Sequence, residues 1–153
     1  MASTVIPPTQ GREPSVTQTT PSAAEVNVGD GVTDHAHMAA AGGQSDVEGS
    51  VTFYVCAADV VPCTSGGNLL GTVPLDGGRN ATSPAFMPTG PGTYCFRGEF
   101  SGNRAYLPSQ DASQGECFVV KAKIPFFPST GALLLGILGS MGGVAGVLFK
   151  RRR

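Results

Sequence analysis

The chain has 153 residues, among them 22 glycines, 12 prolines, 4 cysteines and no tryptophan, and its formal net charge is −1. Four of its ten Lys and Arg residues stand in the closing "KRRR", so the rest of the chain is acidic and has no basic patch. This balance excludes nucleic acid as a partner. The abundance of Val, Thr, Gly and Pro favours short strands and turns, and the length allows one domain of ordinary size.

Residues 1–13 are rich in Thr, Ser and Pro and are predicted to form a linker. The stretch "MASTVIPPTQGREPSVTQTTPSAAE" holds no apolar run of signal-peptide length. We therefore expect the chain to be a fragment of a larger surface protein or the product of a truncated reading frame.

Alternating apolar and polar residues predict an all-β domain over 14–123. In "GSVTFYVC", Val51, Phe53 and Val55 share one face, and the same alternation occurs in "GTYCFRGEF" and "ECFVVKA". Weaker patterns indicate strands at 14–20, 31–39, 69–75 and 80–86. Seven short strands at roughly ten-residue spacing predict a Greek-key β-sandwich.

Three stretches resemble the bacterial Ig-like repeat domains of secreted and surface proteins: "GSVTFYVC", "ATSPAFMPTGPGTYCFRGEFSGNRAYLPSQDAS" and "ECFVV". The resemblance covers about residues 14–121, and "PGTYCFRGEFSGNRAYLPS" carries most of it. The family often has Asp where this chain has Asn103. The resemblance implies an Ig-like sandwich on the cell surface.

The four cysteines are expected to form two disulfides, Cys56 with Cys63 and Cys95 with Cys117. Cys56 and Cys63 close a short loop, and a hairpin of the last two strands would place Cys95 opposite Cys117, both on outward faces. That register would also pair residue 100 with 112 and put Tyr106 at the tip. Four cysteines allow three connectivities, and the alternative is four free thiols in a reducing compartment.

Residues that could support catalysis or metal binding are few. His35 and His37 share a strand face and could share a metal ion, but their parity opposite Ala36 and Met38 predicts a solvated face. Glu99 and Asp111 are predicted to be surface acids without a pairing partner. We expect no catalytic residue, no metal site and no cofactor, and hence no enzyme. The sequence Asn80-Ala81-Thr82 fits an N-glycosylation sequon, which matters only in a host with that machinery.

Residues 132–149 are predicted to form one transmembrane helix. The run has no charged side chain, and as a helix it would reach roughly 27 Å, enough for a bilayer core. A buried helix of a soluble core is the alternative, but Ser140 is the only polar side chain in the run. The basic tail at 150–153 would act as a stop-transfer cluster and place the C-terminus in the cytoplasm, through Lys150, Arg151, Arg152 and Arg153.

The linker at 124–131 ends in "FPSTG", which resembles the LPxTG-type sorting signal of Gram-positive surface proteins. In that family a sortase, which is a transpeptidase, cuts between Thr and Gly and joins the Thr carbonyl to a cell-envelope amine. Pro fixes an extended, kinked backbone before the cut, and Gly leaves the scissile carbonyl unhindered. The alternative is a plain juxtamembrane linker. The motif residues are Phe127, where Leu is commonest, Pro128, Ser129, Thr130 and Gly131.

Three functions from different classes are compatible with these features. The favoured one is a non-enzymatic Ig-like spacer or adhesion module with an unknown surface ligand, anchored at the cell surface through the membrane and a sortase. A pilus subunit with a Lys-to-Asn isopeptide bond is disfavoured, because such a Lys usually lies in an early strand and the first Lys here is Lys121. A tail-anchored cytoplasmic protein would move four positive charges across the membrane against the usual bias.

Overall fold

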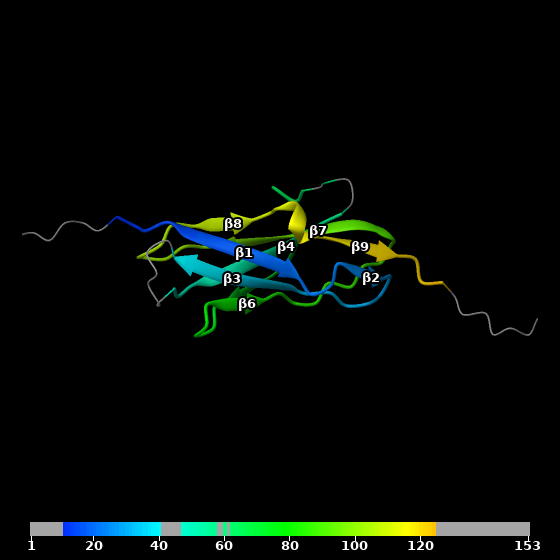
Figure 1. The fold of residues 1–153 in the computed structure, drawn as a ribbon, viewed down its shortest axis with the longest axis horizontal. Helices are drawn as coiled ribbons and strands as arrows, with labels where there is room; N and C mark the ends of the chain where they lie inside the picture. Colours follow the sequence, from blue (N-terminus) through cyan, green and yellow to red (C-terminus); the bar gives the residue numbers. More distant parts are fainter. Residues whose placement is uncertain (1–10, 41–46, 58–59, 61, 125–153) are drawn as a thin grey trace, which may run out of the picture. The chain divides into compact units, whose positions relative to one another are not determined.

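The computed structural model describes residues 11–40, 47–57, 60 and 62–124, and within them the chain forms short strands in two sheets (Figure 1). The elements in chain order are β1 (Ser15–Pro21), β2 (Glu25–Asn27), β3 (Asp34–Ala40), β4 (Ser50–Cys56), β5 (Asn68–Pro74), β6 (Asn80–Thr82), β7 (Gly92–Phe100), β8 (Ser109–Asp111), the 3₁₀ turn η1 (Gln114–Glu116) and β9 (Cys117–Lys121).

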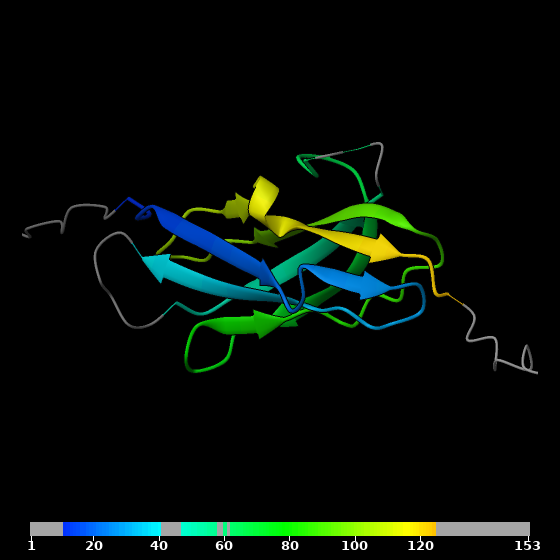
Figure 2. The same ribbon diagram turned by 45° about the vertical axis from the view of Figure 1, so that its right-hand side comes forward.

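The two sheets have the strand orders β1-β3-β6 and β2-β9-β7-β4-β5, and β8 also pairs with β7. The pairings are antiparallel except for β2 with β9, which is parallel. Figure 2 shows β1 and β3 passing in front of β4 and β7. The predicted all-β, two-sheet sandwich is confirmed.

The strand prediction missed β2 and β8 and made the strand at 80–86 too long. Both missed strands have three residues and too little alternation to be read as strands. The strand at 80 ends at Thr82, and the only later pairing in that stretch is a single bridge between Val32 and Phe86. Pro84 lacks the N–H that would continue the ladder.

The core follows the predicted alternation of β4. Val51, Phe53 and Val55 are at most 2% exposed, and Phe96 and Phe100 of β7 meet them from the neighbouring strand. Fully burying side chains of this size stabilises a fold by about 1.5–3 kcal/mol each. Large side chains from the central strands therefore account for most of the apolar burial between the sheets.

The register of β7 agrees with the predicted hairpin at one end only. Cys95 lies opposite Cys117 as predicted, but Phe100 lies opposite Ser109 and not residue 112. The turn η1 takes up the three extra residues between β8 and β9. Tyr106, predicted at the tip, lies in the β7–β8 connection and is 3% exposed because it packs in the core.

Most of the predicted terminal segments lie outside the described residues. These are the sorting motif, the predicted membrane helix (132–149), the basic tail (150–153) and most of the predicted linker at 1–13. Within the described ranges, no helix has the length and apolar character needed to cross a bilayer.

Gly98 sets how closely the two sheets approach. A Cβ atom built on Gly98 of β7 would lie 2.6 Å from Cγ2 of Thr19 on β1 and 3.5 Å from Cγ1 of Val51. Real Cβ atoms do not come this close to another carbon, so a side chain here would push β1 away from β7.

We predict that Gly98→Ala destabilises the domain by about 1–3 kcal/mol in urea unfolding, the usual cost of overpacking a tight interior. The change Thr19→Ser removes Cγ2 and should recover most of that loss in the double variant. Gly77→Ala is the control, because a Cβ on Gly77 meets nothing within 4 Å. A Gly98→Ala variant as stable as the control would contradict the close approach of the sheets.

Candidate functional site

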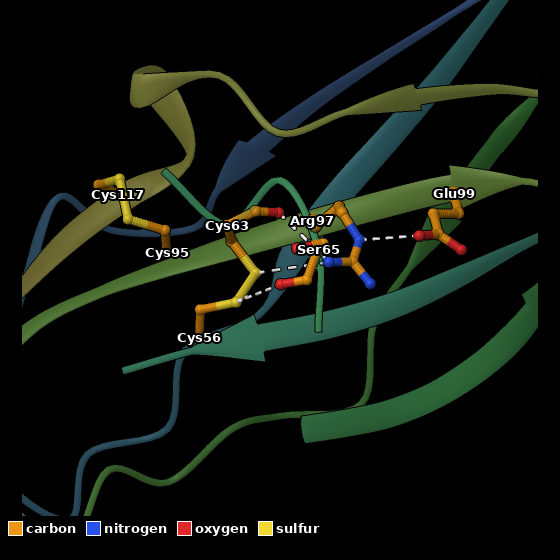
Figure 3. The surroundings of a disulfide bond; sticks show 7 residues. All are labelled: Cys56, Cys63, Ser65, Cys95, Arg97, Glu99 and Cys117. Carbon is orange, nitrogen blue, oxygen red and sulfur yellow. Dashed lines mark hydrogen bonds and ion pairs between the residues drawn. A yellow bond between two sulfur atoms is a disulfide. The ribbon is translucent and has the colours of Figure 1, made fainter. Parts of the chain in front are cut away.

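Three of the four cysteines form a row across neighbouring strands. Cys56 of β4 lies opposite Cys95 of β7, and Cys95 lies opposite Cys117 of β9. The structure joins Cys95 to Cys117 and Cys56 to Cys63, the two pairs expected from the sequence, with no free cysteine among the described residues (Figure 3).

The outer face of β7 is covered. Cys95 was predicted on an outward face, and that face is closed to solvent, because Cys95 and Cys63 are both 0% exposed. The chain after β4 folds back over this face and is tied down by the Cys56–Cys63 bridge. Gly67 lets it return, because its φ is +87° and a Cβ there would lie 2.9 Å from Cys56 Sγ.

Arg97 lies beneath the same segment and is only 4% exposed. Its guanidinium donates a hydrogen bond to the Cys63 carbonyl at 3.3 Å, and its Nε forms an ion pair with Glu99 at 2.8 Å. The guanidinium also stacks 4.3 Å from the centre of the Tyr54 ring. Glu99, predicted to be an unpaired surface acid, is therefore paired. Arg97 has a structural role here, since its charge is paired with Glu99 and one of its donors bonds to the Cys63 carbonyl.

The histidine pair has the predicted orientation. His35 and His37 are exposed on β3, while Ala36 and Met38 between and beyond them are buried. Their Nδ1 atoms lie 3.0 Å from Thr82 Oγ1 and 2.9 Å from Asn80 Oδ1, so each ring contacts the neighbouring strand β6. In the part of the chain that the structure describes, no three His, Cys, Asp or Glu side chains are grouped to hold a metal ion.

Asn103 organises the β7–β8 connection. Its Nδ2 donates to the Glu48 carbonyl at 2.6 Å, and its Oδ1 accepts hydrogen bonds from the amides of Ala105 and Tyr106, each at 2.8 Å. An Asp at this position would keep the acceptor and lose the donor to Glu48. A shallow hollow beside the turn is lined by Glu48, Asn103, Arg104 and Ala105.

Two buried acids were missed by the sequence analysis. Asp34 is 0% exposed and Glu116 is 2% exposed. Burial, together with the negative charge of Glu116, raises the pKa of Asp34 to about 8, and burial also raises the pKa of Glu116. Asp34 could have been found by extending the parity of Ala36 and Met38, which places it on the inward face. No comparable pattern points to Glu116.

Asp111, also predicted to be an unpaired surface acid, joins the two sheets. Its Oδ2 accepts a hydrogen bond from the Thr19 amide at 3.0 Å, and its Oδ1 accepts one from the Ser113 amide at 3.0 Å. Thr19 belongs to β1 and Asp111 to β8, so this carboxylate links the edges of the two sheets.

Two sets of residues predicted from the sequence lie outside the described part of the chain. They are the sorting residues Phe127, Pro128, Ser129, Thr130 and Gly131 and the stop-transfer residues Lys150, Arg151, Arg152 and Arg153. The structure therefore places neither set.

The domain has a distant structural likeness to a known protein. No protein-family model and no curated protein matches the chain. Among solved structures, the chain is similar to the CARDB domain of a Pyrococcus furiosus protein, crystallised in complex with di-metal ions. The two are 16% identical with a TM-score of 0.39, over 71% of this chain and 85% of that domain. This level of similarity transfers no ligand and no function to the present chain.

We predict that the two bridges contribute unequally to stability. The Cys95–Cys117 bridge joins residues 22 apart in the sequence, and the Cys56–Cys63 bridge joins residues 7 apart. Loop-closure entropy then gives a cost of about 3–4 kcal/mol for replacing the first pair with alanines and about 2–3 kcal/mol for the second. Urea unfolding of each double variant measures the difference. A first pair that can be removed without loss of stability would contradict its assignment as a bridge.

Proposed function

We propose that the chain is a non-enzymatic cell-surface protein in which an Ig-like sandwich acts as a spacer or adhesion module. The observation that carries the proposal is the path of the chain: it enters β1 at one end of the sandwich and leaves β9 at the other (Figure 1). A module with its two ends at opposite poles adds its own length to the distance between the segments on its N-terminal and C-terminal sides, as a spacer requires.

The strand order supports an Ig-like topology. A sheet of β1, β3 and β6 facing a sheet in which β9, β7, β4 and β5 are neighbours corresponds to the ABE and GFCC′ arrangement of Ig-like sandwiches. The parallel pairing of β2 with β9 joins an early strand of the domain to its last strand. The ion pair of Lys121 with Glu25 lies on this same ladder.

Two disulfides fit a location outside the cytoplasm. Disulfides persist in oxidising surroundings, and in a small secreted domain they supply stability that a limited core does not. The most buried ionisable groups interact with other groups of the domain and not with an open pocket: Arg97 contacts Cys63 and Glu99, and Asp34 interacts with Glu116. We therefore propose that the domain has no catalytic function and no cofactor.

The C-terminal sequence supports anchoring by a sortase. In this proposal the apolar run and the basic tail hold the chain in the membrane while a sortase thiolate attacks the Thr130 carbonyl. The Thr130–Gly131 amide breaks, the Gly131 amine leaves with a proton, and a thioester forms. A cell-envelope amine then attacks the thioester, which joins Thr130 to the envelope through a new amide and regenerates the thiol. A permanently membrane-anchored protein without processing is the alternative.

We predict that Thr130→Ala blocks processing while Ser129→Ala does not, because position 129 is the variable position of the signal. The full chain, placed behind an export signal in a Gram-positive host with active sortases, is followed by cell fractionation and C-terminal mass analysis. The unaltered chain and Ser129→Ala should end at Thr130 in the envelope fraction, and Thr130→Ala should stay full-length in the membrane fraction. Recovery of the unaltered chain with residues 131–153 intact would favour the permanent anchor.

A further inference from the structure

Two buried carboxyl groups, one on a strand and one on the 3₁₀ turn, act on each other inside the sandwich. Asp34 begins β3 in the three-stranded sheet, and Glu116 ends η1, directly before β9 of the larger sheet. Both side chains are withdrawn from water, at 0% and 2% exposure.

Three of the four carboxyl oxygens of this pair lack a hydrogen-bond donor. Among the described residues, no donor satisfies Asp34 Oδ1, Asp34 Oδ2 or Glu116 Oε2, and Thr19 Oγ1 beside them also has no partner. Ionised carboxylates only accept hydrogen bonds, so two facing carboxylates cannot satisfy each other. If one of them holds a proton, it becomes a donor to the other, and the repulsion between two buried negative charges disappears.

The surroundings supply no compensating positive charge. The charged neighbours that act on Asp34 are Glu116 and Asp111, and both are negative. Strands β1 and β6, which flank β3, contain no titratable residue. The charged or titratable side chains nearby on β3 and β7 belong to the opposite faces of those strands: His35, His37, Arg97 and Glu99.

We propose that Asp34 and Glu116 form a proton-dependent latch, which is closed while the pair holds a proton and opens when both carboxyls ionise. The latch holds the three-stranded sheet against η1. Beside it, the β1–β8 seam consists of side-chain hydrogen bonds, such as Thr17 Oγ1 with Ser109 Oγ at 2.8 Å and the Thr19 amide with Asp111. Opening the latch weakens this seam first.

The direction of the pH effect follows from the raised pKa values. Burial raises the pKa of Asp34 to about 8, so the folded domain keeps a proton that the unfolded chain releases near pH 4. The folded state then binds more protons than the unfolded state between about pH 4 and 8. The stability that this proton provides is therefore fully present below this window and is lost as the pH rises through it. The unfolding equilibrium constant rises by up to about tenfold per pH unit for one proton.

A proton fits this site better than a metal cation. Calcium takes about six to eight oxygen ligands, whereas the pair offers two carboxylates and the Thr19 hydroxyl, and Asp111 already accepts two backbone hydrogen bonds. Binding of a divalent cation is nevertheless a distinct outcome that the experiment can detect.

The test compares the unaltered full chain with Asp34→Asn, each kept in a non-ionic detergent that has no titrating group. Urea unfolding is followed by far-ultraviolet circular dichroism between pH 5 and 7. The ratio of the two unfolding constants should change by up to about 100-fold over this range, with the unaltered chain losing stability relative to the variant as the pH rises. Glu116→Gln should change the ratio less, because it leaves the buried Asp34 carboxyl in place and removes only the negative charge beside it. Asp30→Asn is the control, because the exposed Asp30 has a lowered pKa and stays ionised throughout.

A ratio that stays constant from pH 5 to 7 would overturn the latch. So would a stabilisation of the unaltered chain by calcium chloride at pH 7 that Asp34→Asn abolishes, because the pair would then bind a metal ion. Should Asp34→Asn fail to fold, hydrogen exchange of the Thr19 amide in the unaltered chain decides. After correction for the intrinsic exchange rate, the population of the open state should be larger at pH 7 than at pH 5, and an unchanged population would refute the proposal.

Discussion

The covering of β7 on both faces is the constraint on which the rest of the domain depends. Its inner face packs Phe96 and Phe100 against β4, and its outer face buries Cys95 and Arg97. A strand inside a six-stranded sheet can bury both faces only if something lies over the outer one. Here that cover is the segment held down by the Cys56–Cys63 bridge. The domain thereby gains a second, small interior without a third layer of secondary structure.

The alternation of β4, β7 and β9 made the sandwich predictable, because half-buried strands with one apolar face leave a clear period-two pattern. The cover over β7 was not predictable in the same way. Cys95, Arg97 and Glu99 alternate with the core residues and look like a solvated face, since a covering loop leaves no periodic signal of its own. The pairing of Phe100 with Ser109 was missed for a related reason: a 3₁₀ turn inserts residues without changing the pattern on either side.

The buried acids show the limit of reading burial from residue type. Asp34 stands on the inward face of its strand, yet an acid at a strand end is ordinarily assigned to solvent. Its environment comes from the neighbouring strand β1 and from β8 and η1, which are distant in sequence and only three residues long each. Polar residues thus collect along one edge of the sandwich, while the apolar clusters occupy its middle.

The spacer role and the latch make different demands on the same domain. The proposed spacer needs resistance to being pulled apart, and the Cys95–Cys117 bridge ties the last strand to the neighbouring strand β7. A latch needs a weak point, and the β1–β8 edge is held by side-chain hydrogen bonds and not by a backbone ladder. The two features meet at the start of β9, because Glu116 directly precedes Cys117, which is bridged to Cys95.

The covered face of β7 is tested most directly by mapping the disulfides. The unreduced chain is blocked with an alkylating reagent, digested, and its linked peptides are identified by mass spectrometry. The structure predicts one linkage between Cys56 and Cys63, another between Cys95 and Cys117, and no alkylated thiol. A linkage between Cys56 and Cys95, which are also cross-strand neighbours, would free Cys63 and leave the cover over Arg97 without its tether.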